Sequence, residues 1–314
     1  MTDLPGYCLT TPTPVPVLDA LPAWHARFQA GAAQAATPFE MALRGGFDAD
    51  RLAWAFASGY QAATRALVPD LAPHELVTFS MTEPGGNRPR DLRTACRATP
   101  EGGYLLDGDK RWATLGPAST LYLVVCVLDT PAANGRAALR LARVPAGTPG
   151  LQAEAMPITR YMPELTHGAL QLRGLRLGPG ALLPGDGWED HGKPFRTLED
   201  TLVTTAVLAQ LLREARARAW PGGFIERALA ALLALQGVAA LPPQAASTHV
   251  ALAGALAAAQ ALFAEAGTQW AATPDDPAAQ RWQRDAALLG VAEGTRVQRL
   301  ARAWERLGRA AGAG

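Results

Sequence analysis

A central block of short strand-like runs, framed by helical sequence on both sides, most constrains how this chain can fold. From about residue 74 to residue 183, alternating apolar and polar runs are separated by Gly, Pro, Asn and Asp. This spacing is typical of antiparallel β structure. The sequence on either side of the block is rich in Ala and Leu, and its apolar residues recur at steps of three and four. That periodicity predicts amphipathic helices before and after the strands.

We therefore predict an α+β multidomain protein with three parts in chain order. They are a short N-terminal helical domain at residues 1–75, a central antiparallel β sandwich or barrel at 76–190, and a C-terminal helical bundle at 191–314. The length of 314 residues suffices for two or three domains of roughly 100–150 residues each. Hydrophobic residues make up 49% of the chain and charged residues 18%, a balance that supports a buried core.

Composition and charge argue against several classes of function. The net charge of +1 provides no overall field for nucleic acid. The longest apolar runs, at 121–128 and 228–235, are shorter than the roughly 20 residues that span a bilayer. Cys8, Cys96 and Cys126 are too few and too widely spaced for a disulfide framework, and the histidines show no metal-ligand spacing. We expect a cytoplasmic protein without a nucleic-acid partner, a membrane span or a metal site.

Two short motifs lie on either side of a predicted hairpin. Residues 79–86 read FSMTEPGG, and residues 108–116 read GDKRWATLG. Between them, PEGGYLLDGDK carries two turns of the hairpin type. Neither motif is specific alone, but their order and spacing together are informative.

With these motifs the chain resembles the acyl-CoA dehydrogenases, flavoenzymes with a helical N-terminal domain, a central β domain and a C-terminal helical bundle. The resemblance is to a compact, divergent member with a shortened C-terminal part, and it covers roughly residues 37–210. Two later stretches, ARVPAGTPGLQ at 142–152 and the strand at 168–188, also look like the family's sequence. The residues that match the two family motifs are Phe79, Thr82, Glu83, Pro84, Gly85, Gly108, Lys110, Trp112 and Thr114.

The resemblance implies that FAD is the cofactor and that its flavin ring lies against the β domain, near Phe79. The backbone and hydroxyl around Met81 and Thr82 would form hydrogen bonds with the pyrimidine edge of the ring. Trp112 would pack beside the ring, and Thr114 would reach N5 or the neighbouring carbonyl. Such contacts tune flavin chemistry. On the residues alone, Trp112 could instead fill a β-domain core, and Thr82 could cap a turn.

The segment after the first motif departs from the family pattern. The family usually continues Gly-x-Gly-Ser-Asp, whose serine meets the FAD pyrophosphate, whereas residues 85–91 read GGNRPRD. Arg88 and Arg90 could replace the serine through charge-assisted bonds to phosphate. They could equally form a solvated turn. The family's Arg-x-x-Phe-Gly segment, which touches FAD across a subunit interface, has no convincing counterpart after Trp188.

Glu293 is the candidate catalytic base by resemblance, because residues 293–295 match the Glu-Gly-Thr of a family motif. A second alignment makes this segment an earlier bundle helix that ends at 307–314. Glu293 also falls on an apolar stripe at helical spacing, so it needs either a raised pKa or an arginine partner from another helix. The predicted stripe comprises Trp282, Ala286, Leu289, Val297, Leu300, Trp304 and Leu307.

Two functions remain open on the sequence. The first is an FAD-dependent oxidoreductase that acts on the CH–CH group of an acyl-CoA or another acyl thioester, as a homo- or hetero-oligomer, with electron-transfer flavoprotein as a candidate acceptor. The second is a non-catalytic scaffold of the same fold, or a partner subunit of a hetero-oligomeric complex. The missing phosphate-binding serine and the uncertain base favour the second.

Overall fold

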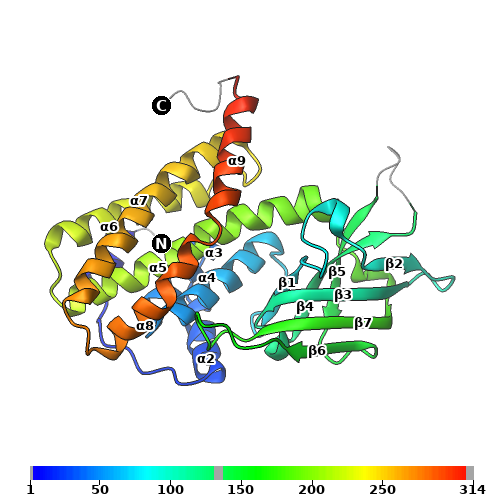
Figure 1. Cartoon of the computed structure of the whole chain (residues 1–314), viewed down its shortest axis with the longest axis horizontal. Coiled ribbons are helices and arrows are strands. Elements are labelled where there is room, and N and C mark those ends of the chain that lie inside the picture. Colours follow the sequence, from blue (N-terminus) through cyan, green and yellow to red (C-terminus); the bar gives the residue numbers. More distant parts are fainter. Residues whose placement is uncertain (1–2, 131–136, 309–314) are drawn as a thin grey trace. The chain divides into compact units, whose positions relative to one another are not determined.

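The computed structural model describes residues 3–130 and 137–308, and the chain divides into two compact units (Figure 1). The helical unit comprises Met1–Pro69, Arg160–Glu164 and Thr197–Gly314. The sheet unit comprises Asp70–Thr159 and Leu165–Arg196. The first and last helical stretches of the sequence thus belong to one unit. The domain boundaries at residues 75 and 190 stay predictions.

The helical unit is built from helices that lie before and after the sheet in the sequence. Thr37 illustrates how one of them begins: its side chain accepts a hydrogen bond from the Glu40 amide, and Pro38 occupies the first helical position. The helices are α1 (Leu4–Thr10), α2 (Leu21–Ala32), α3 (Pro38–Phe47), α4 (Leu52–Leu67), α5 (Lys193–Ala217, in this unit from Thr197), α6 (Gly222–Ala239), α7 (Ala246–Ala271), α8 (Pro277–Asp285) and α9 (Glu293–Arg306).

Aromatic stacking and close helix approach form the core of the helical unit. The rings of Trp24 and Trp54 stack with centroids 5.4 Å apart, and Trp24 Nε1 donates to Ser58 Oγ at 3.0 Å. Two glycines let α5 lie directly on α3 and α4. A Cβ atom at Gly46 would lie 2.1 Å from the Ala206 carbonyl oxygen, and one at Gly59 would lie 2.4 Å from a backbone atom of α5.

An ion-pair cluster joins the start of α5 to α9 within the helical unit. The Asp200 carboxylate accepts from Arg296 at 2.8 Å and from Arg299 at 2.7 Å. All three side chains are mostly shielded from solvent, so this cluster is screened less than a surface pair. It anchors the last described helix to α5, a helix of 25 residues.

The sheet unit contains one seven-stranded sheet in the order β1-β4-β2-β3-β7-β6, with β5 paired to β4. The strands β1 and β2 both pair with β4 in parallel, whereas the other pairings are antiparallel. The strands are β1 (Val77–Ser80), β2 (Ala95–Ala98), β3 (Tyr104–Thr114), β4 (Leu121–Leu128), β5 (Leu139–Pro145), β6 (Leu151–Ala155) and β7 (His167–Leu177).

The two parallel pairings differ from the predicted antiparallel domain, and the register gives the reason. β1 pairs with residues 121–124 of β4, and β2 pairs with residues 127–128 of the same strand. Since β5 pairs along the whole of β4, β1 and β2 must follow one another along its other edge. The chain leaves this edge after Ser80, forms the loop of residues 81–94, and returns to the same edge at Ala95. The mixture of helices and a sheet is as expected.

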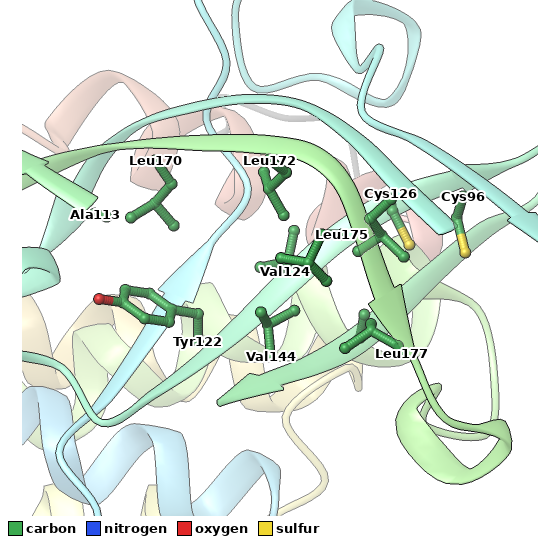
Figure 2. Packing of buried hydrophobic residues seen from close by; sticks show 12 residues of the cluster. Cys96, Ala113, Tyr122, Val124, Cys126, Val144, Leu170, Leu172, Leu175 and Leu177 are labelled. Atoms are coloured by element: carbon green, nitrogen blue, oxygen red, sulfur yellow. The ribbon is translucent and has the colours of Figure 1, made fainter. Parts of the chain in front are cut away.

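A continuous apolar cluster fills one side of the sheet. Figure 2 shows Leu170, Leu172 and Leu175 of β7 lying over Val124 of β4 and Val144 of β5, all of them buried. Burial of side chains at this density is the main favourable term in folding. The three cysteines are free and buried.

Two helices of the described residues, α6 and α7, are long and apolar enough to cross a membrane by length and composition alone. Core helices of soluble proteins pass the same test, so this is weak evidence. The absence of a membrane span therefore stays a prediction. Within residues 3–130 and 137–308, no group of three or more His, Cys, Asp or Glu side chains is placed to hold a metal ion.

We expect Gly46→Ala to destabilise the protein by about 1–3 kcal/mol, because the added methyl group must push α5 away from α3. Thermal unfolding followed by circular dichroism measures the effect. The matched control is Gly254→Ala on the exposed face of α7, where an added Cβ meets nothing within 4 Å. That change should stabilise the protein by about 0.5–1 kcal/mol. An unfolding temperature that rises in both variants would contradict the close approach.

Candidate functional site

A buried ion pair joins the two motifs that the sequence singles out. Lys110 Nζ lies 2.7 Å from Glu83 Oε1, and the two side chains are 0% and 4% exposed. Lys110 lies on β3, and Glu83 lies in the loop of residues 81–94, which we call the Thr-Glu-Pro loop. The pair therefore fixes this loop to the strand that carries the second motif.

The remaining bonds of Glu83 fold the Thr-Glu-Pro loop around its carboxylate. Oε1 also accepts from the Thr94 amide at 3.0 Å and the Thr94 hydroxyl at 2.7 Å, and Oε2 accepts from the Arg93 amide at 2.6 Å. The backbone of Glu83 exchanges two further bonds with Gly86. Buried charges are tolerated when they are paired and hydrogen-bonded in this way. One side chain thus closes both ends of the loop.

The pKa values of the pair are shifted by burial and by mutual attraction. Burial acts to raise the pKa of Glu83, but the charge of Lys110 and the hydrogen bonds from Lys110 and Thr94 outweigh it, so this pKa lies below its ordinary value. Burial lowers the pKa of Lys110, and the charge of Glu83 offsets only part of that effect. Glu83 is therefore ionised at neutral pH.

A β-bulge after Lys110 turns Trp112 outward. Residues i and i+2 of a regular strand point to the same face. Here Lys110 is fully buried, whereas Trp112 is 51% exposed. The register explains the difference: between Lys110 and Ala113, β3 advances three residues while β7 advances two. Trp112 also has a φ of +58°, which is uncommon for a bulky residue and costs of order 1–3 kcal/mol.

The strained Trp112 is held by its neighbours in the sheet unit. Its amide donates to Met156 Sδ at 3.4 Å, and its ring meets the His167 ring edge-on with centroids 5.9 Å apart. The preceding Arg111 amide donates to the Thr82 carbonyl at 2.8 Å, a second link between the two motifs. Burial lowers the pKa of His167 despite its bond to the Leu165 backbone, so its imidazole is neutral at pH 7. The result is a fixed, partly exposed indole beside the Thr-Glu-Pro loop.

The other residues predicted to contact a flavin lie near the bonds that join the two motifs. Phe79 is buried and stacks on Phe195 with centroids 4.3 Å apart. Met81 is also buried, and Thr82 is partly exposed. The carbonyl of Thr114 accepts from the Thr78 hydroxyl, and its side chain is partly exposed. The structure thus brings Thr82 and Trp112 together through the Arg111 amide, whereas Phe79 packs into an aromatic pair.

Arg88 and Arg90 lie on the outer part of the Thr-Glu-Pro loop. Both are exposed, and the Arg90 side chain is 75% exposed. The Arg88 amide donates to Asp91 at 3.2 Å, and Arg90 lies 3.8 Å from the same carboxylate. The arginine side chains are therefore open to solvent. Their role at a phosphate stays a prediction.

Glu293 begins α9, and its side chain is exposed within the helical unit. The predicted apolar stripe around it is wrong, because α8 ends at Asp285 and residues 286–290 form a separate short turn. Val297 and Leu307 are 56% and 47% exposed. No ion pair of Glu293 is found among the described residues, and part of the segment 307–314 lies outside them. The role of Glu293 as a base stays a prediction.

Comparison with known proteins finds a similar domain for the part of the chain that carries these features. Residues 78–174 match the family model of the acyl-CoA dehydrogenase middle domain. This range includes both motifs, the buried pair and Trp112. This part of the chain is similar to the acyl-CoA dehydrogenase middle domain.

Several solved structures share the fold over most of the chain. Glutaryl-CoA dehydrogenase from Mycobacterium smegmatis, solved with FADH2, matches 93% of this chain over 87% of its own, with a TM-score of 0.70 and 15% identity. Butyryl-CoA dehydrogenase from Megasphaera elsdenii matches 92% of this chain over 90% of its own, with a TM-score of 0.67 and 16% identity. FMN-bound TdsC from Paenibacillus sp. A11-2 matches 87% of this chain over 84% of its own, with a TM-score of 0.67 and 17% identity. No curated protein sequence matches significantly.

Sequence reasoning missed the partners that hold the two motifs in place. It matched Glu83 and Lys110 to the motifs without predicting that they bind each other. The sequence carried little signal for this pair, because Lys110 stands between Asp109 and Arg111 and Glu83 lies in a turn-rich segment outside the predicted strands. His167 and Met156 carried no such signal, because their approach to Trp112 depends on the pairing of β6 and β7 with the bulged strand.

We expect Lys110→Met to destabilise the protein by about 3–5 kcal/mol, because it leaves the buried Glu83 carboxylate without its cation. Denaturant unfolding measures the change. The control is Arg97→Met, which removes a half-exposed partner of Asp107 in the same sheet and should cost about 0–1 kcal/mol. Equal losses in the two variants would contradict the special role of the buried pair.

Measuring the stability of the wild type and of Glu83→Gln at several pH values separates the contribution of charge from that of packing. Since the folded pKa of Glu83 lies below the ordinary 4.5, its ionisation stabilises the fold above that pH, and the contribution is lost as pH falls through the folded pKa. The stability gap between the wild type and Glu83→Gln should therefore narrow below about pH 4.5. A gap that stays constant down to pH 3 would show that packing alone is responsible.

Proposed function

We propose that this protein is a flavoprotein that binds FAD and oxidises the CH–CH bond of an acyl-CoA or another acyl thioester. The observation that supports it most is the half-exposed Trp112, which a strained bulge turns outward and whose neighbour Arg111 donates its amide to Thr82 of the Thr-Glu-Pro loop. Backbone strain of this kind tends to be retained at functional sites.

The residues present are suited to a flavin ring. The indole of Trp112 offers a flat apolar surface, and Thr82 beside it offers a hydroxyl with no hydrogen bond among the described residues. The side chain of Thr114 offers a second hydroxyl. A bound flavin would supply the acceptor for the hydride that leaves the substrate's β-carbon. Within the protein, Trp112 orients the ring, Thr82 and Thr114 bind its polar edge, and Glu83 keeps the loop in register.

FAD rather than FMN is the proposed cofactor because two cations lie on the outer part of the loop. Arg88 and Arg90 would bind the pyrophosphate that the missing serine would otherwise meet. The M. smegmatis relative was solved with FADH2 and the Paenibacillus relative with FMN, so both cofactors occur on this fold. We further propose a cytoplasmic oligomer that passes electrons to a carrier such as electron-transfer flavoprotein.

Glu293 is the base in this proposal. It would take the α-proton of the thioester while the hydride leaves the β-carbon. A base of this kind must be shielded from water. Glu293 is exposed in the described helical unit, so its shielding has to come with substrate binding. The non-catalytic alternative is favoured by the same exposure, and measurements of flavin binding and of flavin bleaching separate the two proposals.

We expect the purified protein to bind FAD and to be stabilised by it against heat. Trp112→Ala should weaken the binding of FAD and of riboflavin alike, at least tenfold, because the ring-contacting surface is lost. The double variant Arg88→Ala/Arg90→Ala should weaken the binding of FAD and leave that of riboflavin unchanged, because riboflavin has no phosphate. Fluorescence quenching of each flavin measures the affinities, with Arg97→Ala as the control for lost surface charge. If neither flavin binds the wild type, the proposed function is lost.

We expect Glu293→Gln to bind flavin normally and to lose at least 100-fold in the rate at which an acyl-CoA bleaches the flavin absorbance. The exposed Glu305→Gln on the same helix serves as the control and should bleach at the wild-type rate. Bleaching that survives Glu293→Gln would exclude Glu293 as the base. If the wild-type protein binds flavin but no acyl-CoA bleaches the flavin absorbance, the result would instead favour the non-catalytic scaffold.

A further inference from the structure

Two residues with a left-handed backbone lie on either side of Thr114 in the sheet unit. Trp112 has a φ of +58° and Leu115 has a φ of +60°. A large side chain makes this conformation costly, so it persists only where the surrounding structure enforces it. The segment from Trp112 to Gly116 therefore depends on bonds from other parts of the sheet to keep its conformation.

Two buried hydroxyls bind carbonyl groups of this segment. Thr78 of β1 donates to the Thr114 carbonyl, and Tyr122 of β4 donates to the Gly116 carbonyl at 2.7 Å. The two donors are direct partners in the parallel pairing of β1 with β4, and they are 0% and 2% exposed. Figure 2 shows the Tyr122 ring at the end of the apolar cluster, with its hydroxyl oxygen pointing away from Val144. Both bonds thus reach the segment from the interior of the sheet unit.

Ser119 extends the bond of Thr78 into a short chain of hydroxyls. Its Oγ lies 2.6 Å from Thr78 Oγ1 and 3.1 Å from the Leu115 carbonyl oxygen. Each hydroxyl has one proton to donate. Since the Thr78 proton goes to Thr114, the proton between the two hydroxyls comes from Ser119. Hydrogen bonds in such a chain polarise and strengthen one another.

All three carbonyls from Thr114 to Gly116 accept hydrogen bonds. The Leu115 carbonyl accepts from the Ala118 amide at 2.9 Å, and the Gly116 carbonyl accepts from the Ser119 amide at 3.2 Å as well as from the tyrosine. Burial raises the pKa of that tyrosine, so its hydroxyl keeps its proton at neutral pH. The Thr114 side chain stays partly exposed while its carbonyl is held from within.

We propose that Thr78 and Tyr122 are positioning residues of the proposed flavin site. Being buried, they act through the backbone and not by contact with the flavin. They hold the carbonyls of Thr114 and Gly116, and so fix the direction in which the Thr114 side chain leaves the backbone. Ser119 supports them by binding Thr78. The inference rests on the proposed function, because Thr114 is the residue of this segment that would meet the flavin.

Amide hydrogen exchange in the flavin-free protein tests the hold on the turn. Thr78→Val and Tyr122→Phe each remove one hydroxyl and keep the shape of the side chain. We expect the protection of the Ala118 and Ser119 amides to fall at least threefold in both variants, while amides of β5 keep theirs. The matched control is Tyr104→Phe, since Tyr104 is a partly buried tyrosine of the same sheet whose hydroxyl has no hydrogen bond within the described part of the chain. Unchanged protection in both variants overturns the proposal.

Riboflavin affinity in a double-mutant cycle tests the effect on the site. Thr78→Val should weaken riboflavin binding about three- to tenfold, which corresponds to one hydrogen bond. Thr78→Ser keeps the hydroxyl and should bind as the wild type does. In the Thr114→Val background, Thr78→Val should have no further effect, because the hydroxyl that it positions is gone. An equal loss with and without the Thr114 hydroxyl overturns the proposal, because Thr78 would then act on the fold as a whole.

The two measurements separate this inference from the proposed function. If the wild type binds no riboflavin, the proposed function is lost, and exchange at Ala118 and Ser119 alone decides whether the hydroxyls hold the turn. If Thr78→Val fails to fold, Ser119→Ala removes the far member of the hydroxyl chain and takes its place in both measurements, with the same expected losses.

Discussion

The ion pair between Glu83 and Lys110 is the constraint on which the rest of the candidate site depends. It lies in the interior of the sheet unit, where an unpaired charge would be costly, so neither residue can leave without the other. Through Thr94 and Arg93 it closes the Thr-Glu-Pro loop, which interrupts the edge of β4 between β1 and β2. The loop can therefore be long and still have one conformation, as a cofactor-binding loop requires.

The same pair accounts for the exposure of Trp112. Lys110 must point inward to reach Glu83, and a regular strand would then bury residue 112 on the same face. The bulge and the positive φ of Trp112 release it from that face. The strain of the bulge is offset by the bonds that surround it, among them the one from the Arg111 amide to Thr82. A buried charge and an exposed indole two residues apart are thus two consequences of one local backbone irregularity.

The sequence predicted the order of helices, strands and helices, because periodicity and turn residues are local signals. It also predicted that the two motifs act together. The parallel pairings of β1 and β2 could not be predicted, since they depend on a loop that returns to the edge it left. The stripe around Glu293 failed because periodicity assumes one continuous helix, whereas the buried Asp285 binds the Met162 amide and ends α8.

The most direct test of this account is amide hydrogen exchange in Lys110→Met, compared with the wild type under conditions where both are folded. The Thr94, Arg93 and Arg111 amides are bonded within the loop assembly, so exchange should report its opening. The account predicts that protection falls at these three amides, while amides in the middle of β4 and β5 keep theirs. Unchanged protection at Thr94 and Arg111 would contradict it, because the loop would then hold its conformation without the buried pair.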